Sequence, residues 1–359
     1  MPTRSQILVR AADLRAVFEA QGAAVVETPI LQPATALLEL YGEDMRARAY
    51  VTSDALRGEQ MLRPDFTVPV VQMHMANGDD PARYTYAGEV FRRQERDPDR
   101  ANEYIQVGYE VFDRADPAAA DAEVFALIAQ ELAGLPVRAV TGDIGVLMAA
   151  VEGLQTTARR KHALIRHIWR PRRFRALLER FAGRSPVPPS RTALLAGAAK
   201  ADAPLIGLRS STEIAQRIDA LREDAATPPL SAQQVDLIEA LLGVRAVMPH
   251  ALGHLHDLAV DMPCISDAVA RVTAREAALR ARGVDTDDLM FETSYGRSSM
   301  EYYDGFVFGF RAEARADLPI LASGGRYDAM TRQLGQGREI PAVGGVMRPG
   351  LMLELEAGT

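Results

Sequence analysis

The chain of 359 residues has one cysteine, few aromatic residues and no long hydrophobic run. Because Cys264 stands alone, no internal disulfide can form and no cluster of thiolates can hold a metal ion. The N-terminal segment lacks an uninterrupted apolar core, and no later stretch approaches the roughly 18 apolar residues of a membrane helix. We therefore predict a protein of the reducing cytoplasm that is neither exported nor inserted in a membrane.

The composition is otherwise that of an ordinary globular protein, with 48% hydrophobic and 25% charged residues. The net charge of -7 argues against a dedicated nucleic-acid coat but leaves room for a local basic patch that binds an anion. At about 150 residues per domain, the length predicts two domains, or one core with a large insertion.

Helical and strand patterns divide the chain into a split core and an insertion. Apolar residues recur at helical spacing between Ser5, a candidate N-cap, and Gly22. Short strand-like runs follow and predict an antiparallel sheet, at 24–31, 49–54, 60–64, 83–93 and 103–113. A helix is predicted over 117–134 and a strand over 135–143.

The middle of the chain has almost no strand pattern. Alanine, leucine and arginine at helical spacing predict an all-helical insertion over 146–254, between core segments 1–145 and 255–359. Strand patterns return afterwards, at 288–294, 301–312 and 318–323. Two glycines in 323–328 then predict a tight turn with backbone amides available to an anion, although such glycines usually serve chain geometry alone.

The runs 83–92 and 104–112 contain the clearest candidate site. Strand alternation places Gln106, Gly108 and Glu110 on one face, with Gln106 and Glu110 roughly 13 Å apart. Gly108 leaves room for a small ligand against the backbone, and Arg92 ends the first run beside a charged loop. The residues alone leave two interpretations open, a polar pocket floor or the solvated face of a hairpin.

Two other stretches are equally ambiguous. In 62–69, Asp65 and Thr67 either meet a ligand or cap the helix that follows. In 302–310, five of nine residues are aromatic, and this run is either a core strand or a pocket wall. Strand alternation would put Tyr302 and Tyr303 on opposite faces.

A basic run at 159–184 holds ten Lys or Arg and one Glu. It suits RNA, a phosphorylated substrate or an acidic partner subunit, or it is a solvated helical face. Only Trp169 and Phe174 are available there for base stacking. The histidines of the chain lack the spacing and the acidic or cysteine companions of a metal site, so no metal is expected.

Several of these segments resemble the catalytic core of a class II aminoacyl-tRNA synthetase, specifically histidyl-tRNA synthetase. The opening helix, strand and Pro29 resemble the first class II motif, and EVFRRQ followed by EYIQVGYEVF resembles the second. EYYDGFVF and SGGRYDAMTRQLG resemble segments particular to the histidine enzyme. The resemblance covers 1 to about 145 and 255–359. It implies an α+β fold, an antiparallel sheet flanked by helices with an all-helical insertion.

The resemblance also implies a histidine pocket. Asp65, Thr67 and Gln106 would surround the α-amino group, which needs oxygen acceptors. Glu110 and Tyr303 would bond the two imidazole nitrogens. Arg92 would lie on the carboxylate or phosphate side. The full set of expected histidine-binding residues is Asp65, Thr67, Arg92, Gln106, Glu110, Tyr302 and Tyr303.

Departures from the synthetase pattern argue against adenylation. The third class II motif ends in an arginine that clamps ATP, and Leu351 stands at its place. A second arginine, which contacts the carboxylate being activated, is replaced by Ser298. Removing one such donor typically costs about a hundredfold or more in rate. The chain also stops after the third motif, so a C-terminal anticodon-binding domain is not expected.

A synthetase core with these losses resembles the regulatory subunits of ATP phosphoribosyltransferase. That resemblance implies a non-catalytic subunit without a cofactor, which pairs with a short catalytic subunit in a cytoplasmic hetero-octamer for the first step of histidine biosynthesis. L-histidine would be the feedback inhibitor, and the chain would self-associate through the class II dimer interface. Two alternatives stay open: a truncated enzyme that activates an amino acid for a non-tRNA acceptor, and an RNA-binding module that uses the basic run.

Overall fold

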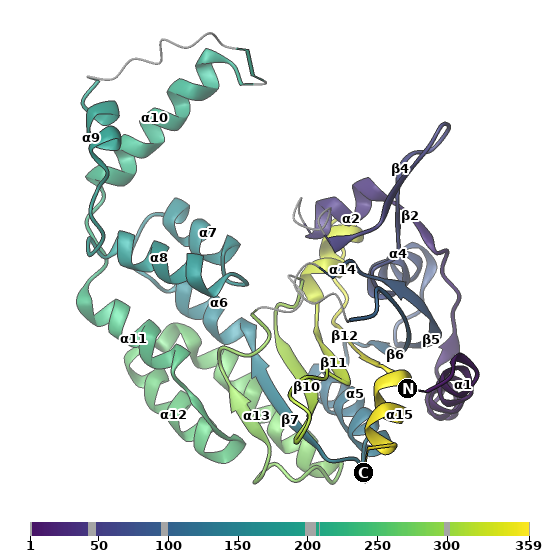
Figure 1. The fold of residues 1–359 in the computed structure, drawn as a ribbon. Coiled ribbons are helices and arrows are strands. Elements are labelled where there is room, and N and C mark those ends of the chain that lie inside the picture. The colour runs from purple at the N-terminus through teal and green to yellow at the C-terminus, as the bar shows by residue number, and fades with distance from the viewer. Residues whose placement is uncertain are drawn as a thin grey trace.

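The computed structural model describes residues 2–41, 48–94, 100–197, 206–207, 209–297 and 302–358. Within these ranges, nine strands form one mixed sheet in the order β1-β5-β6-β12-β11-β10-β7-β9-β8 (Figure 1). Neighbours from β5 to β7 pair antiparallel, whereas β1 runs parallel to β5 and β9 to β7. The strands are β1 (Ala24–Val25), β5 (Ala82–Phe91), β6 (Glu103–Phe112), β12 (Ala342–Met347), β11 (Ala322–Arg326), β10 (Phe306–Ala312), β7 (Val137–Asp143), β9 (Met290–Glu292) and β8 (Arg245–Val247).

Helices cover both faces of this sheet, which confirms the predicted α+β class. On one face, Phe18 of α1 (Arg4–Ala20) stacks on Tyr109, with ring centroids 5.0 Å apart. On the same face α5 (Pro117–Glu131) packs, and α13 (Ser266–Ala281) packs on α5. On the other face, His74 of α4 (Thr67–Asn77) stacks on Phe112 at 3.8 Å. Next to α4 lies α14 (Asp328–Leu334). Both faces of the sheet are therefore covered by helices.

The N-terminal helix begins two residues earlier than its pattern predicts. Thr3, not Ser5, is the N-cap, because its side chain accepts the Gln6 N–H while the Gln6 side chain accepts the Thr3 N–H. This reciprocal capping box satisfies two otherwise unpaired backbone donors. The helix ends before Gly22, which adopts a φ of +86°.

The predicted strand at 24–31 is split. Its first two residues form β1. After Pro29 the chain enters a second sheet, which has three strands within the described residues, in the order β2-β4-β3. Proline lacks a backbone N–H and so interrupts a ladder. The elements of this small sheet are β2 (Leu31–Pro33), β3 (Val51–Asp54) and β4 (Gly58–Leu62), and α2 (Ala34–Tyr41) follows β2.

Buried ion pairs tie α13 to the sheet. Arg275 of α13 donates to Asp121 of α5 at 2.7 Å and to Asp143 of β7 at 2.8 Å, and these side chains are at most 4% exposed. Arg326 of β11 adds a second guanidinium to Asp121 at 2.7 Å. Each buried charge is thus compensated by a hydrogen-bonded partner, as burial requires.

The segment 146–254 is mostly helical, but the prediction of an all-helical insertion is wrong in detail. β8 lies inside it and pairs with β9 at the edge of the main sheet. Three residues are too short to show alternation, so only the tertiary pairing defines this strand. The helices are α6 (Ile144–Glu152), α7 (Ala158–Arg166), α8 (Pro171–Phe181), α9 (Pro189–Leu195), α10 (Ser211–Ala226), α11 (Ala232–Leu242) and α12 (Met248–Asp261), then the short η1 (Pro263–Ile265).

The two ends of the chain and the helical segment lie on opposite sides of the molecule. α15 (Pro349–Glu356) packs on α1, and Arg10 pairs with Glu356 between them. Figure 1 shows the N- and C-termini near each other there, with α9 and α10 projecting from the far side. In the described part of the chain, no helix is both long and apolar enough to cross a membrane.

Candidate functional site

A small pocket opens on the face of the sheet that carries Glu110. Side chains from α4, β6, the segment before β10 and the ends of β11 and β12 line it. The cavity between them measures about 20 Å³, roughly room for one water molecule. The structure brings together at this pocket all seven side chains expected from the resemblance, Asp65, Thr67, Arg92, Gln106, Glu110, Tyr302 and Tyr303.

Glu110 is the centre of a hydrogen-bond network. Its Oε1 accepts from Tyr86 at 2.8 Å and from Thr67 at 3.2 Å, and its Oε2 accepts from Tyr327 at 2.5 Å. Glu110 is 1% exposed and Gln106 is 0% exposed, so the interpretation as a solvated hairpin face is wrong. Helix α4, through Thr67 and His74, and Tyr327 after β11 cover this face of the sheet.

Burial dominates the electrostatics of this carboxyl. Desolvation raises the pKa of Glu110 to about 7, although the hydroxyls of Tyr327, Tyr86 and Thr67 stabilise the carboxylate and limit the rise. A carboxylate has about four lone-pair positions, and these hydroxyls occupy three. One acceptor position therefore remains for an N–H group of a ligand.

Glycines make the space for this network. A Cβ on Gly344, directly across the ladder from Glu110, would lie 1.5 Å from Glu110 Oε2. A Cβ on Gly108 would lie 2.1 Å from the ring of Tyr86. The space beside Gly108 thus holds a tyrosine of the neighbouring strand. The prediction that a ligand occupies this space is wrong.

Gln106 differs from its neighbours because its polar atoms are unused. Neither Oε1 nor Nε2 forms a hydrogen bond, although both are buried. A buried amide without partners costs about 1–3 kcal/mol for each unsatisfied group. Its place at the pocket wall makes it ready to bind a polar ligand.

Asp65 and Thr67 do not cap α4, so that alternative is wrong. The N-cap is Phe66, which has no side-chain cap bond, and Thr67 donates to Glu110 instead. Asp65 Oδ2 lies 3.8 Å from Arg92 Nη2. Arg92 itself donates from Nε to the Pro64 carbonyl at 2.7 Å, which fixes the arginine at the pocket.

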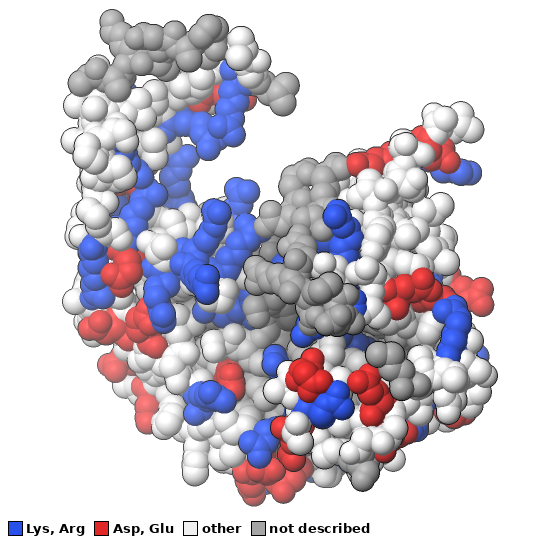
Figure 2. All heavy atoms as spheres, viewed as in Figure 1, with Lys and Arg blue, Asp and Glu red and all other residues white. Residues whose placement is uncertain are grey.

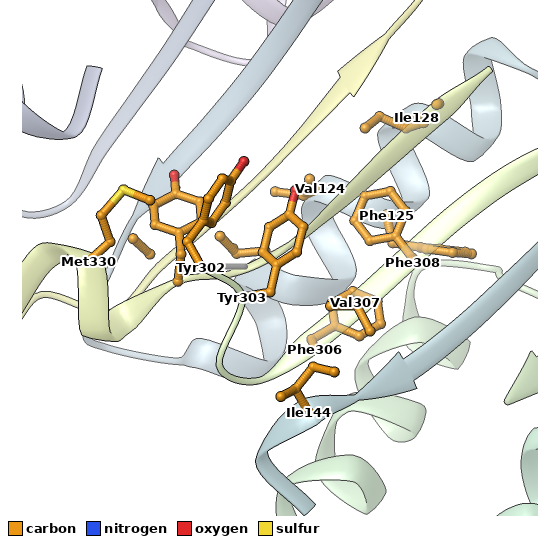
Figure 3. Close-up of a cluster of buried hydrophobic side chains, with 14 of the residues drawn as sticks. Val124, Phe125, Ile128, Ile144, Tyr302, Tyr303, Phe306, Val307, Phe308 and Met330 are labelled. Carbon is orange, nitrogen blue, oxygen red and sulfur yellow. The ribbon is translucent and has the colours of Figure 1, made fainter. Parts of the chain in front are cut away.

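Tyr302 and Tyr303 precede β10 instead of belonging to it. Both reach the pocket, with ring centroids 4.6 Å apart, so the expectation of opposite strand faces is wrong. Figure 3 shows them beside the loop, while Phe306 and Phe308 lie with Phe125 of α5. The aromatic stretch is therefore both things proposed for it, a pocket wall followed by a core strand.

Two positions of this chain, Ser298 and Leu351, stand where the histidyl-tRNA synthetase pattern has arginine, and the structure describes only one of them. Ser298 lies outside the described residues. Leu351 lies on α15, packed against the hydrophobic core. The predicted turn at 323–328 is wrong, because Ala322–Arg326 is strand β11 between β10 and β12.

Among the side chains that the sequence analysis did not predict at this site are Tyr327 and Arg348, which line the pocket, and Tyr86, which donates to Glu110. The ladder of β5 and β6 pairs Tyr86 with Gly108, so strand alternation across the hairpin could have found this tyrosine. Tyr327 and Arg348 come from the C-terminal strands, whose position in the sheet no local pattern indicates.

The basic run is partly neutralised within the fold. Asp224 of α10 binds Arg160, Arg180 and Arg191. Phe174 is fully buried, so it cannot stack on a base. Figure 2 shows Lys and Arg gathered over α7 and α8. Four arginines form no ion pair with the described residues, namely Arg159, Arg166, Arg172 and Arg173. No group of metal-ligating side chains occurs in the ranges that the structure describes.

Known proteins similar in sequence to this chain agree with the family resemblance. A sequence profile described as histidyl-tRNA synthetase matches residues 4–223 and 211–349. The chain is 32% identical over 353 residues to proteins of Brucella ovis and Brucella canis named ATP phosphoribosyltransferase regulatory subunit. Each match covers 92% of this chain and 93% of the relative.

Solved structures share the fold. A protein of Bacillus halodurans, titled ATP phosphoribosyltransferase regulatory subunit/histidyl-tRNA synthetase, superposes with a TM-score of 0.70 at 21% identity, over 99% of this chain and 80% of that one. Histidyl-tRNA synthetase from Nostoc gives 0.64 at 17% identity, over 98% and 72%. The predicted class II synthetase-like fold is confirmed.

The curated relatives carry the name of a regulatory subunit, as the family resemblance led us to expect. The chain belongs to the family of ATP phosphoribosyltransferase regulatory subunits, built on the histidyl-tRNA synthetase core.

Proposed function

We propose that this regulatory subunit senses L-histidine in the pocket around Glu110 and passes the signal to a short-form ATP phosphoribosyltransferase catalytic subunit, at the first step of histidine biosynthesis. The observation that carries the proposal is the buried amide of Gln106, unpartnered beside a carboxyl that still offers an acceptor position. Buried polar groups are nearly always hydrogen-bonded, so this pocket suits a polar ligand.

The chemistry of the lining fits histidine group by group. An ammonium needs oxygen acceptors, and Asp65, Thr67 and Gln106 supply a carboxylate, a hydroxyl and an amide oxygen. An imidazole has two nitrogens on opposite ring edges, and Glu110 and Tyr303 lie at the same pocket. No single side chain here is specific, but the combination matches an amino acid with an N–H in its side chain.

The small cavity indicates how binding would be transmitted. A cavity of about 20 Å³ is smaller than an amino acid, so binding would have to widen the pocket, and Tyr302 and Tyr303 are among the side chains that line it. Their segment leads directly into β10 at the centre of the sheet. Histidine can shift activity only by binding the inhibited state better, with a typical coupling of about 1–3 kcal/mol.

The test is reconstitution. We expect the purified chain to bind a short-form catalytic subunit, to raise its activity and to make that activity fall as histidine is added. Calorimetry should show histidine binding to the chain alone. If the chain neither associates with the catalytic subunit nor confers a histidine response, the proposal is wrong.

Self-association through the first class II motif is part of the proposal. Large apolar side chains are exposed along one part of the molecule, from α1 to β2: Leu8, Val9, Val25, Ile30 and Leu31, at 42–60% exposure. Exposed apolar side chains such as these are typical of a protein interface. Hetero-octamer formation with the catalytic subunit follows from the resemblance.

The double substitution Val9→Asp and Leu31→Asp is expected to reduce the molar mass of the chain to that of a monomer. Two charges would have to be buried in the proposed interface without partners. Sedimentation equilibrium measures the mass. Val260→Asp is the matched control, because Val260 is 78% exposed on the distant α12. A wild-type chain that is already monomeric, or a double variant of unchanged mass, contradicts this interface.

Glu110→Gln is expected to flatten the pH dependence of stability between about pH 4.5 and pH 7. Because its folded pKa is raised, the protonated carboxyl stabilises the native state fully below pH 4.5, and this contribution is lost as the pH rises through about 7. Urea unfolding across this window measures the difference between wild type and variant. Asp304, whose burial also raises its pKa to about 7, contributes equally to both proteins. Identical pH profiles would contradict a buried acid at position 110.

A further inference from the structure

We propose that Arg348, a residue outside the set implied by the resemblance, joins Arg92 at one end of this pocket and binds the α-carboxylate of the amino-acid ligand. The inference rests on the proposed function and names the residue that selects a ligand with a free carboxylate. Arg348 stands three residues before Leu351, the position where the synthetase pattern has its arginine.

Arg348 has the position and the free donors that such a subsite needs. It follows β12 as the N-cap residue of α15 and lines the pocket together with Arg92. Its side chain forms no hydrogen bond and no ion pair with the described residues, and its guanidinium lies over the ring of Tyr104 at 5.0 Å. An arginine that is packed on an aromatic ring and lacks a carboxylate partner retains its forked donors for a planar anion.

The surrounding charges favour an anion at this place. Burial lowers the pKa of Arg348, and the cationic neighbours Arg92 and Arg100 lower it further. Asp65 lies 3.8 Å from Arg92, so its charge is directed to that arginine. A bound carboxylate would relieve the repulsion between cations in a site with little solvent, where electrostatic interactions are strong.

The strand register gives the ligand a direction. β12 pairs Met347 with Val107 and Gly344 with Glu110. Arg348, which follows β12, is therefore next to Gln106 of β6. Glu110 lies four residues after Gln106 on β6. A histidine molecule placed along the strand would have its carboxylate and ammonium at the Arg348 and Gln106 end and its imidazole at the Glu110 end. Gln106 and Glu110 match this order, whereas Thr67, which donates to Glu110, lies nearer the imidazole end.

A phosphate would suit two arginines as well as a carboxylate does, so the test compares both. Calorimetry would titrate L-histidine, L-histidinol, which has an alcohol in place of the carboxylate, and ATP into wild type and Arg348→Met. We expect wild type to prefer histidine over histidinol by about 10- to 100-fold, the weight of one hydrogen-bonded charge pair. Arg348→Met should lose this preference and keep its affinity for histidinol.

Controls separate the subsite from folding and from the proposed function. Arg332→Met removes an exposed arginine that pairs with Glu339 and should change nothing. Arg348→Lys should keep part of the preference, because it retains the charge but not the fork. Equal loss for histidine and histidinol, no loss for either, or ATP binding that depends on Arg348 while histidine binding does not, would each overturn the carboxylate assignment. A wild type that binds no histidine contradicts the proposed function itself.

Discussion

Glu110→Ala is expected to weaken histidine binding by about 10- to 100-fold, which corresponds to one hydrogen bond to a charged group. The substitution removes the pocket carboxylate that we propose as the acceptor for an imidazole N–H. Calorimetric titration of histidine into wild type and variant measures the ratio. Unchanged affinity in the variant would show that histidine binds elsewhere, for instance at a subunit interface.

The same substitution also affects folding, which the design must separate. Without Glu110, the buried hydroxyls of Tyr86 and Tyr327 lose their acceptor, at about 1–3 kcal/mol for each unsatisfied group. Glu110→Gln is the matched variant, since it keeps an oxygen of the same reach and loses the charge. We expect Glu110→Gln to unfold closer to wild type in urea while still binding histidine more weakly.

Arg275→Leu is expected to lower the free energy of unfolding by about 3–5 kcal/mol, the usual cost of removing one partner of a buried ion pair. Asp121 would keep Arg326, but Asp143 would lose the one guanidinium that pairs with it among the described residues. Asp143 is 1% exposed, so solvent cannot replace the lost partner. Urea unfolding followed by circular dichroism measures the change.

The control for this prediction lies on the same helix. Arg280 of α13 pairs with Asp287 at the surface, and exposed pairs contribute about 0–1 kcal/mol. Arg280→Leu should therefore leave the urea midpoint nearly unchanged. Similar losses for both variants would mean that the helix surface, and not the buried network, determines the effect.

The sequence predicts well what depends on neighbouring residues. Alternation over 103–112 correctly puts Gln106 and Glu110 on one face, and the runs at 83–93 and 117–134 appear as β5 and α5. Local spacing determines these elements because each buries a face that its own periodicity defines.

What the sequence does not predict depends on distant partners. Tyr327, which is 217 residues away along the chain, helps to bury the Glu110 face, and no local pattern indicates this contact. β8 exists only through its pairing with β9, and Arg348 reaches the pocket only because β12 lies beside β6. Family resemblance supplied the pocket residues that periodicity could not, since it carries tertiary information from another chain.

The order of the main sheet has a consequence for how the protein is made. β10, β11 and β12 lie between β6 and β7, yet they are synthesised after both. A chain still attached to the ribosome with β7 already outside therefore has two strands whose inner edges lack partners, and unpaired edges promote aggregation. The ligand pocket forms only when the last strands insert between them.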